Sequence, residues 1–157
     1  MMKRFLASLF LVCIMVFSFT SVSYAENWEW IMTTDDTKYS FDTTSVKDNS
    51  IKNINPECSQ FVYSVNIKYE YTNSKGKDMA KKHNFKKPIS YIIYEEDINY
   101  KTKSELIKSM YLFDNDGKII LGGPTYCTEF QPITPASIGE AIYIATLKQY
   151  QAQYGKK

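Results

Sequence analysis

A long alternation of apolar and polar residues in the middle of the chain constrains the fold most strongly. Every second residue from Phe61 to Tyr71 is aromatic or β-branched, and most residues between them are polar, namely Ser64, Asn66, Lys68 and Glu70. Side chains of a β-strand alternate between two faces, whereas those of a helix repeat every 3.6 residues. The sequence therefore predicts a long antiparallel strand with one buried face and one face in water.

Shorter strands are expected on both sides of this segment. Residues 28–32 and 38–42 alternate around a polar turn, which predicts a first hairpin. Residues 89–94 are continuously apolar and predict a central strand that ends in solvent at the acidic residues 95–97. The segment at 73–77 has turn composition, so the lysine-rich residues after it are expected to complete a hairpin with the long strand.

The second half of the chain contains one strong turn signal and one helix signal. Asp114-Asn115-Asp116-Gly117 separates two apolar segments, and Asp-Gly favours a hairpin because such turns require positive φ. Ser137 and Glu140 form a capping box, and the apolar residues after them recur at helical spacing, which predicts a helix over residues 138–153. Strands followed by a helix predict an α+β fold, an antiparallel sheet of about five or six strands with a C-terminal helix on one face.

The first 25 residues have the composition of a secretory signal peptide. Lys3 and Arg4 precede an apolar run from Phe5 to Phe19, and Ser23-Tyr24-Ala25 offers a cleavage site before Glu26. The alternative is a membrane anchor, but the apolar run is shorter than the roughly 20 residues that cross a bilayer. We expect residues 1–25 to be removed and residues 26–157 to form one exported domain that is periplasmic, on the cell surface or secreted.

The charge of the expected mature domain limits its partners. Residues 26–157 contain 17 Lys, 17 Asp and Glu, and no Arg, because the only Arg lies in the leader. A chain without net charge or Arg has neither the field nor the bidentate group that binds nucleic acid. We expect no nucleic-acid partner and, once the leader is cleaved, no transmembrane segment.

One segment departs from this even balance of charge. It carries six lysines, Lys75, Lys77, Lys81, Lys82, Lys86 and Lys87, interrupted only by Asp78 among charged residues. Six ammonium groups close together can attract a polyanion or an acidic protein surface. The structural alternative is a soluble hairpin whose lysines discourage edge pairing.

No motif of a known catalytic or metal site is present. His83 is the only histidine, and no Cys, His or acidic cluster has the spacing of a zinc site. The sequence contains no nucleophile elbow, phosphate-binding loop or dinucleotide fingerprint. A small hydrolase that pairs Cys58 with His83 is an alternative, but we expect a non-enzymatic protein without cofactor or metal.

Three groups of residues resemble the surface-adhesin protein E-like family of bacterial envelope proteins. They are the aromatic segment 28–31 with residues 38–46, the hairpin segment 111–118, and the helix entry 133–143. The resemblance implies a small antiparallel sheet with a C-terminal helix against it. It also implies an exported protein of a family named for adhesion to host matrix proteins, although no adhesive motif can be transferred residue by residue.

These observations predict an exported binding module of a bacterial envelope. Its partner would be a host extracellular-matrix protein or a polyanion, bound through the lysine-rich segment. The alternative is a structural or assembly protein that forms a homodimer through a sheet edge or an aromatic face.

The cysteines of the mature domain predict a disulfide. Cys58 and Cys127 are an even pair in a chain expected to enter an oxidising compartment. A bond between them would stabilise the fold by about 4 kcal/mol in the chain-entropy model. The alternative is a pair of buried free thiols.

A thiol count on the purified mature protein tests the pairing. We expect no reactive thiol in denaturant before reduction, and one from each of Cys58 and Cys127 after it. Two reactive thiols in the unreduced protein, purified without reductant, would contradict the disulfide.

Overall fold

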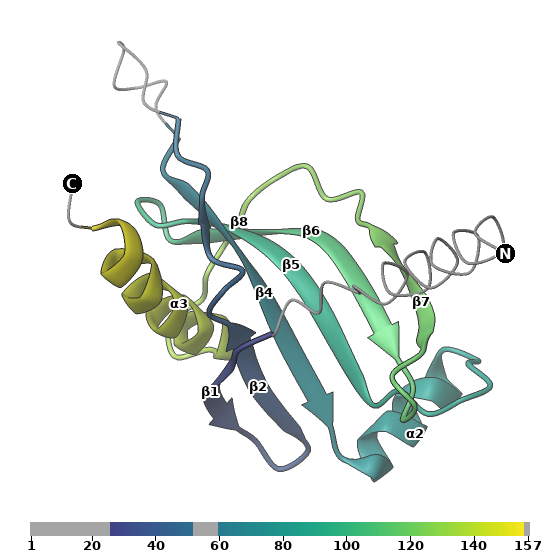
Figure 1. Ribbon diagram of the computed structural model, residues 1–157. Helices are drawn as coiled ribbons and strands as arrows, with labels where there is room; N and C mark the ends of the chain where they lie inside the picture. Colours follow the sequence, from purple (N-terminus) through teal and green to yellow (C-terminus); the bar gives the residue numbers. More distant parts are fainter. Residues whose placement is uncertain (1–25, 52–59, 156–157) are drawn as a thin grey trace, which may run out of the picture.

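Four strands come first in the described chain, and a helix separates them from four further strands, which a second helix follows (Figure 1). The computed structural model describes residues 26–51 and 60–155. The elements are β1 (Trp28–Thr33), β2 (Thr37–Asp42), β3 (Lys47–Asp48), β4 (Val62–Tyr71), α2 (Asn73–Lys82), β5 (Tyr91–Asn99), β6 (Ser104–Phe113), β7 (Ile119–Pro124), β8 (Gln131–Pro132) and α3 (Ile138–Tyr154).

All strand pairs of the sheet are antiparallel. The main order is β1-β2-β4-β5-β6-β7, with β3 pairing beside β2 on β4 and β8 pairing beside β7 on β6. The sheet has eight strands, six of them along this main path, and the predicted α+β class with a C-terminal helix is confirmed. The hairpin around residues 114–117 and the first aromatic hairpin are also present.

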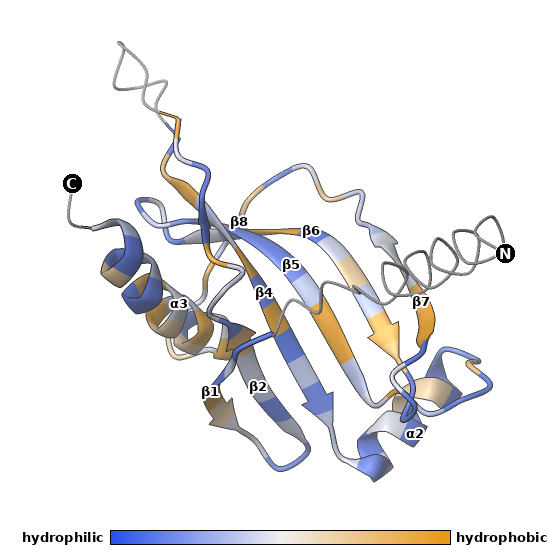
Figure 2. Ribbon diagram, in the orientation of Figure 1, coloured by the Kyte–Doolittle hydropathy of each residue, from blue (hydrophilic) through white to orange (hydrophobic). Residues whose placement is uncertain are grey.

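The alternation along β4 sets the buried face of the sheet. Tyr63, Val65 and Ile67 are almost completely buried. The residues between them are polar: Ser64 is buried, and Asn66 is half-buried. Tyr63 pairs with Ile98 of β5 and Tyr69 pairs with Ile92, so these residues share one face. Figure 2 shows hydrophilic and hydrophobic residues interleaved along the central strands.

The C-terminal helix α3 covers one half of this face. Its residues Ile142, Tyr143 and Tyr150 pack into the cluster formed by the buried side chains of β2, β4 and β5. The hydroxyl of Tyr63 lies 2.9 Å from that of Thr146, which is completely buried. A paired hydroxyl avoids the cost of a buried group without a hydrogen bond.

The predicted capping box begins α3. The amide of Glu140 donates to the Ser137 hydroxyl at 3.2 Å, and the Glu140 carboxylate accepts from the amide of Ala136 at 2.7 Å. Both contacts satisfy amide groups that have no partner inside the helix.

The lysine-rich segment forms helix α2, so the prediction of a second strand of a hairpin was wrong. Gly76 and Ala80, one helical turn apart, form its buried side, and Ala80 packs with Ile89, Ile92 and Leu112. Because Ile92 lies opposite Tyr69, α2 covers the same face as α3. Figure 1 shows it at the other end of the sheet, where β4 ends.

Strand β5 also continues beyond its predicted end. Glu96 pairs with Val65 of β4 and Ile107 of β6, and its side chain lies on the buried face. Only 3% of Glu96 is exposed, so the expectation that residues 95–97 end the strand in solvent was wrong. Backbone pairing on both sides extends the strand regardless of side-chain polarity.

The close contact of Gly76 with the backbone of Ile89, which follows α2 in the chain, predicts an unusual mutational effect. A Cβ at this position would lie 2.0 Å from the carbonyl oxygen of Ile89. Gly76→Ala should therefore destabilise the protein by about 2 kcal/mol or more, although alanine normally favours a helix by about 1 kcal/mol over glycine. Urea unfolding measures the change.

The exposed Ser74 provides the matched control within the same helix. Ser74→Ala should leave the free energy of unfolding within about 0.5 kcal/mol of wild type, since little packing changes there. A Gly76→Ala protein as stable as the Ser74→Ala protein would contradict the close packing of α2.

Candidate functional site

The six lysines predicted to bind a partner lie on α2 and on the loop that follows it. Lys75, Lys77, Lys81 and Lys82 are in the helix, and Lys86 and Lys87 are in the loop before β5. The small residues Gly76 and Ala80 face the sheet and turn most of the lysines outward. The structure therefore gathers them at one end of the sheet, on a helix and a loop instead of a hairpin.

Two of the six lysines are neutralised by acidic side chains from distant turns. The Lys75 ammonium lies 2.8 Å from Asp36 in the β1–β2 turn, and Lys87 binds Asp114 before the β6–β7 turn. Hydrogen bonding to Asp36 raises the pKa of Lys75, and hydrogen bonding to Asp114 raises that of Lys87. These two lysines anchor α2 and its loop to the sheet.

The other four lysines keep their charge available. Lys77, Lys81, Lys82 and Lys86 are exposed and form no ion pair with any residue in the described ranges. Lys81 and Lys82 also lie in the last turn of α2, where positive charge stabilises a helix by about 0.3–1 kcal/mol. This stabilisation explains why Lys81 and Lys82 stand at the end of the helix, and their ammonium groups remain exposed to solvent.

A pocket of about 470 Å³ lies beside Lys86. It lies between the loop after α2 and the β6–β7 hairpin, and its lining residues are Asn84, Phe85, Lys86, Lys87, Asp114, Lys118, Ile119 and Ile120. Ile119 is 61% exposed and Leu121, on the same edge strand β7, is 50% exposed. Lysines and apolar residues thus line the pocket together. We use the name basic pocket for it together with Lys77, Lys81 and Lys82 of the nearby helix.

The Asp114 carboxylate holds the hairpin side of the basic pocket in place. It is buried and accepts hydrogen bonds from the amides of Asp116 and Lys118, both at 2.9 Å. The hydrogen bond from Lys87 lowers the pKa of Asp114, so this carboxylate stays ionised. Lys118 and Ile119, which sequence reasoning missed, reach the pocket through this turn.

The structure describes two of the other residues that the sequence singled out, His83 and Cys127. His83 is exposed at the C-terminal end of α2, with its ring 6.3 Å from that of Phe85. Cys127 is exposed in the segment between β7 and β8 and has no disulfide partner within the described residues. Cys58 lies outside them, so its predicted bond to Cys127 and its alternative pairing with His83 stay predictions.

The buried Glu96 is the residue that sequence reasoning assigned to the wrong environment. Its Oε2 has no hydrogen-bond partner in the described chain, and Glu105 lies near it on the same face. Burial raises the pKa of Glu96 to about 8, and the charge of Glu105 adds to the rise. Because its carboxyl is buried and titrates away from its ordinary range, Glu96 affects the stability of the fold.

The described part of the chain offers no cluster of three His, Cys, Asp or Glu side chains suited to a metal ion. Neither of its helices is long and apolar enough to cross a membrane.

Comparison of the chain with protein-family models, with curated proteins and with solved structures gave no match in any of the three. The resemblance to the surface-adhesin protein E-like family is not tested by these comparisons and stays a prediction.

The raised pKa of Glu96 predicts a loss of stability with rising pH. Between pH 4.5 and about 8 the folded protein keeps a proton that the unfolded chain has released. This group therefore lowers the free energy of unfolding by about 1.4 kcal/mol per pH unit in that interval. Glu96→Gln should remove this slope. The free energy of unfolding of the variant, compared with that of wild type at the same pH, should therefore be higher at pH 8 than at pH 5.

Urea unfolding at both pH values measures the slope. Glu95→Gln is the matched control, because Glu95 is the adjacent residue of β5 on the opposite face, beside Lys108. An unchanged slope in Glu96→Gln, or the same change in both variants, would show that Glu96 is not the titrating group.

Proposed function

We propose that the protein is an exported, non-enzymatic binding module that uses the basic pocket to hold an acidic region of another protein. The observation that carries this proposal is the combination of four exposed lysines, which form no ion pair within the described residues, with a partly apolar pocket that includes the exposed Ile119. Export rests on the signal-peptide composition of residues 1–25.

The two parts of the basic pocket would contribute differently to binding. Exposed lysines raise the rate of association with an acidic surface, an effect that salt screens over about 8 Å at physiological ionic strength. Burial of apolar side chains such as Ile119 mainly lengthens the lifetime of the complex. A protein partner fits both parts, whereas a polysaccharide polyanion would use only the lysines.

A protein of the host extracellular matrix is the partner class that the family resemblance suggests. The charge pattern supports an acidic segment within such a protein. Binding to heparin alone would instead indicate a polyanion as the partner.

Homodimer formation is the second candidate function, and β7 favours it. β7 is the outermost strand beside β6, and it exposes Ile119 and Leu121. An exposed apolar edge strand can pair with the same strand of a second copy. The molecular mass in dilute solution separates this assembly role from the binding of a different partner.

Replacement of the four unpaired lysines tests the binding module. A variant with Gln at Lys77, Lys81, Lys82 and Lys86 should bind immobilised matrix proteins at least about tenfold more weakly and with a smaller salt dependence, because the attractive field is lost. Surface plasmon resonance at several salt concentrations measures both quantities.

A variant with Gln at the exposed lysines Lys38, Lys47, Lys103 and Lys148 has the same net charge and serves as the control. Ile119→Ser should increase the dissociation rate from a protein partner and leave heparin binding unchanged. Equal losses of affinity in both quadruple variants would show that the basic pocket is not the binding surface.

A further inference from the structure

The face of the sheet opposite the two helices carries a pocket with mostly polar side chains. Its volume is about 420 Å³, and its lining residues are Ser45, Lys47, Asn49, Ser64, Val65, Asn66, Glu95 and Lys108. Ser64 and Asn66 alternate along β4 with the buried residues that pack against α3, so their side chains point to the other face. Lys47 lies opposite Ser64 in the β3–β4 pair and shares this face. We call it the polar pocket.

Hydrogen bonds between side chains of several strands hold the polar pocket in shape. The side-chain amide of Asn49 donates to the Ser64 hydroxyl, which donates to the Asp97 carboxylate. The Lys108 ammonium lies 3.1 Å from a carboxylate oxygen of Glu95 and 3.7 Å from one of Asp97. Because each group positions the next, the polar atoms are preorganised for a ligand.

Other groups of the polar pocket keep hydrogen-bonding capacity. Asn66 is half-buried, and its side-chain amide forms no hydrogen bond with any described residue. The exposed Lys47 ammonium forms no ion pair within residues 26–51 and 60–155. Each carboxylate oxygen of Glu95 accepts one hydrogen bond, from Lys108 or from Ser109 at 3.2 Å, and can accept a second. The pocket therefore offers donors and acceptors side by side.

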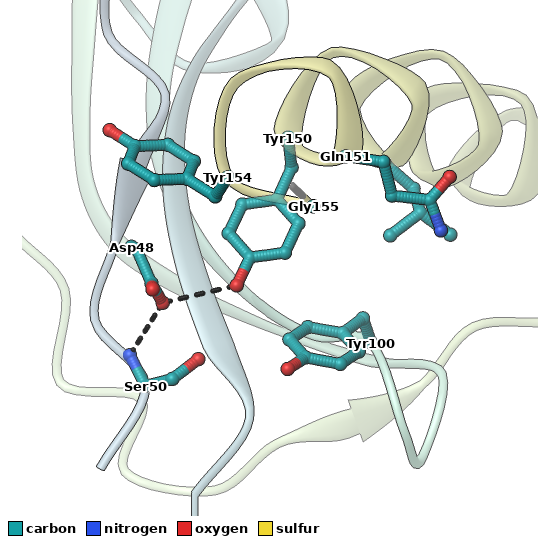
Figure 3. Close-up of a pocket in the computed structure, with 8 residues that line it drawn as sticks. Asp48, Ser50, Tyr100, Tyr150, Gln151, Tyr154 and Gly155 are labelled. Atoms are coloured by element: carbon teal, nitrogen blue, oxygen red, sulfur yellow. Dashed lines mark hydrogen bonds between the residues drawn. The ribbon is translucent and has the colours of Figure 1, made fainter. Parts of the chain in front are cut away.

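The pocket at the C-terminal end of α3 differs, because its central groups are engaged within the fold (Figure 3). Asp48 accepts hydrogen bonds from the Tyr150 hydroxyl at 3.1 Å and from the Ser50 amide at 3.0 Å. The Tyr150 ring packs against Tyr63 at 4.8 Å and Tyr100 at 5.3 Å. Of these two pockets, the polar pocket is the better candidate for a ligand.

The charges at the polar pocket balance. Lys47 and Lys108 bring two positive charges, and Glu95 with the adjoining Asp97 brings two negative charges. A balanced set favours neither a simple anion nor a simple cation. It suits a neutral molecule whose groups both donate and accept hydrogen bonds, and hydroxyl groups do both.

An aromatic side chain continues this face beyond the polar pocket. Ser109 lies opposite Glu95, and Tyr111 is two residues further along β6 on the same face, about 7 Å away. Tyr111 is 37% exposed, and its ring lies over Gly122, where a Cβ would come within 2.2 Å of it. Such a supported ring offers apolar surface to the carbon-bound face of a ligand.

We propose that the polar pocket binds one sugar unit of an oligosaccharide. The hydroxyl groups of that unit would donate to Glu95 and accept from Asn66 and Lys47, and Tyr111 would contact the next unit of the chain. The volume of about 420 Å³ is large enough for one unit. This proposal does not depend on the basic pocket, because the two pockets share no lining residue.

Titration of the mature protein with sugars, followed by NMR, tests the proposal. The probes are glucose, galactose, mannose and N-acetylglucosamine, with lactose and maltose as disaccharides. Cyclohexanol serves as a ring with a single hydroxyl, and sodium sulfate serves as an anion. We expect at least one sugar to shift the Asn66 side-chain resonances and the amides of Lys47 and Glu95 at millimolar concentrations. Cyclohexanol and sulfate should leave them unchanged.

Substitutions separate the contributions to sugar binding. Asn66→Thr suits a strand and removes the amide, so it should weaken binding about fivefold, and Lys47→Gln should weaken it about threefold. Lys148→Gln, on the exposed side of α3, makes the same charge change away from the pocket and should leave binding unchanged. Tyr111→Ser should weaken binding of a disaccharide about fivefold and of a monosaccharide less than twofold. Urea unfolding confirms that each variant is folded.

Several results would overturn the proposal. One is the absence of shifts with all six sugars, and another is cyclohexanol binding as strong as sugar binding, which would indicate apolar contact alone. Shifts at Lys47 with sulfate but with no sugar would indicate an anion site instead. A folded Asn66→Thr protein with wild-type sugar affinity would also exclude the polar pocket, as would equal effects of Lys47→Gln and Lys148→Gln.

Discussion

Strand β4 is hydrogen-bonded along both of its edges, to β2 and β3 on one side and to β5 on the other. Because side chains alternate along each strand, this register decides which residues of several strands share a face. A slip by one residue would turn Tyr63, Val65 and Ile67 toward solvent and leave α3 without an apolar surface. The position of the helices on the sheet therefore depends on the pairing of β4.

The sequence predicted correctly those elements that are determined by a few neighbouring residues. The alternation of β4, the Asp-Gly turn after Asp114 and the capping box of α3 each satisfy their backbone groups nearby. Helix α2 has no comparable signal, because its buried side is formed by the small residues Gly76 and Ala80. Its first residues are equally common in turns and at helix starts.

The sequence indicated which residues were basic but not which would remain unpaired. Lys75 and Lys87 are neutralised by Asp36 and Asp114, which lie far from them in the sequence and reach them only through the fold. Glu96 illustrates the opposite case, since its polarity suggested a solvent-exposed position and its pairing on both sides buried it. Polar composition predicts exposure only where the backbone is free to leave the sheet.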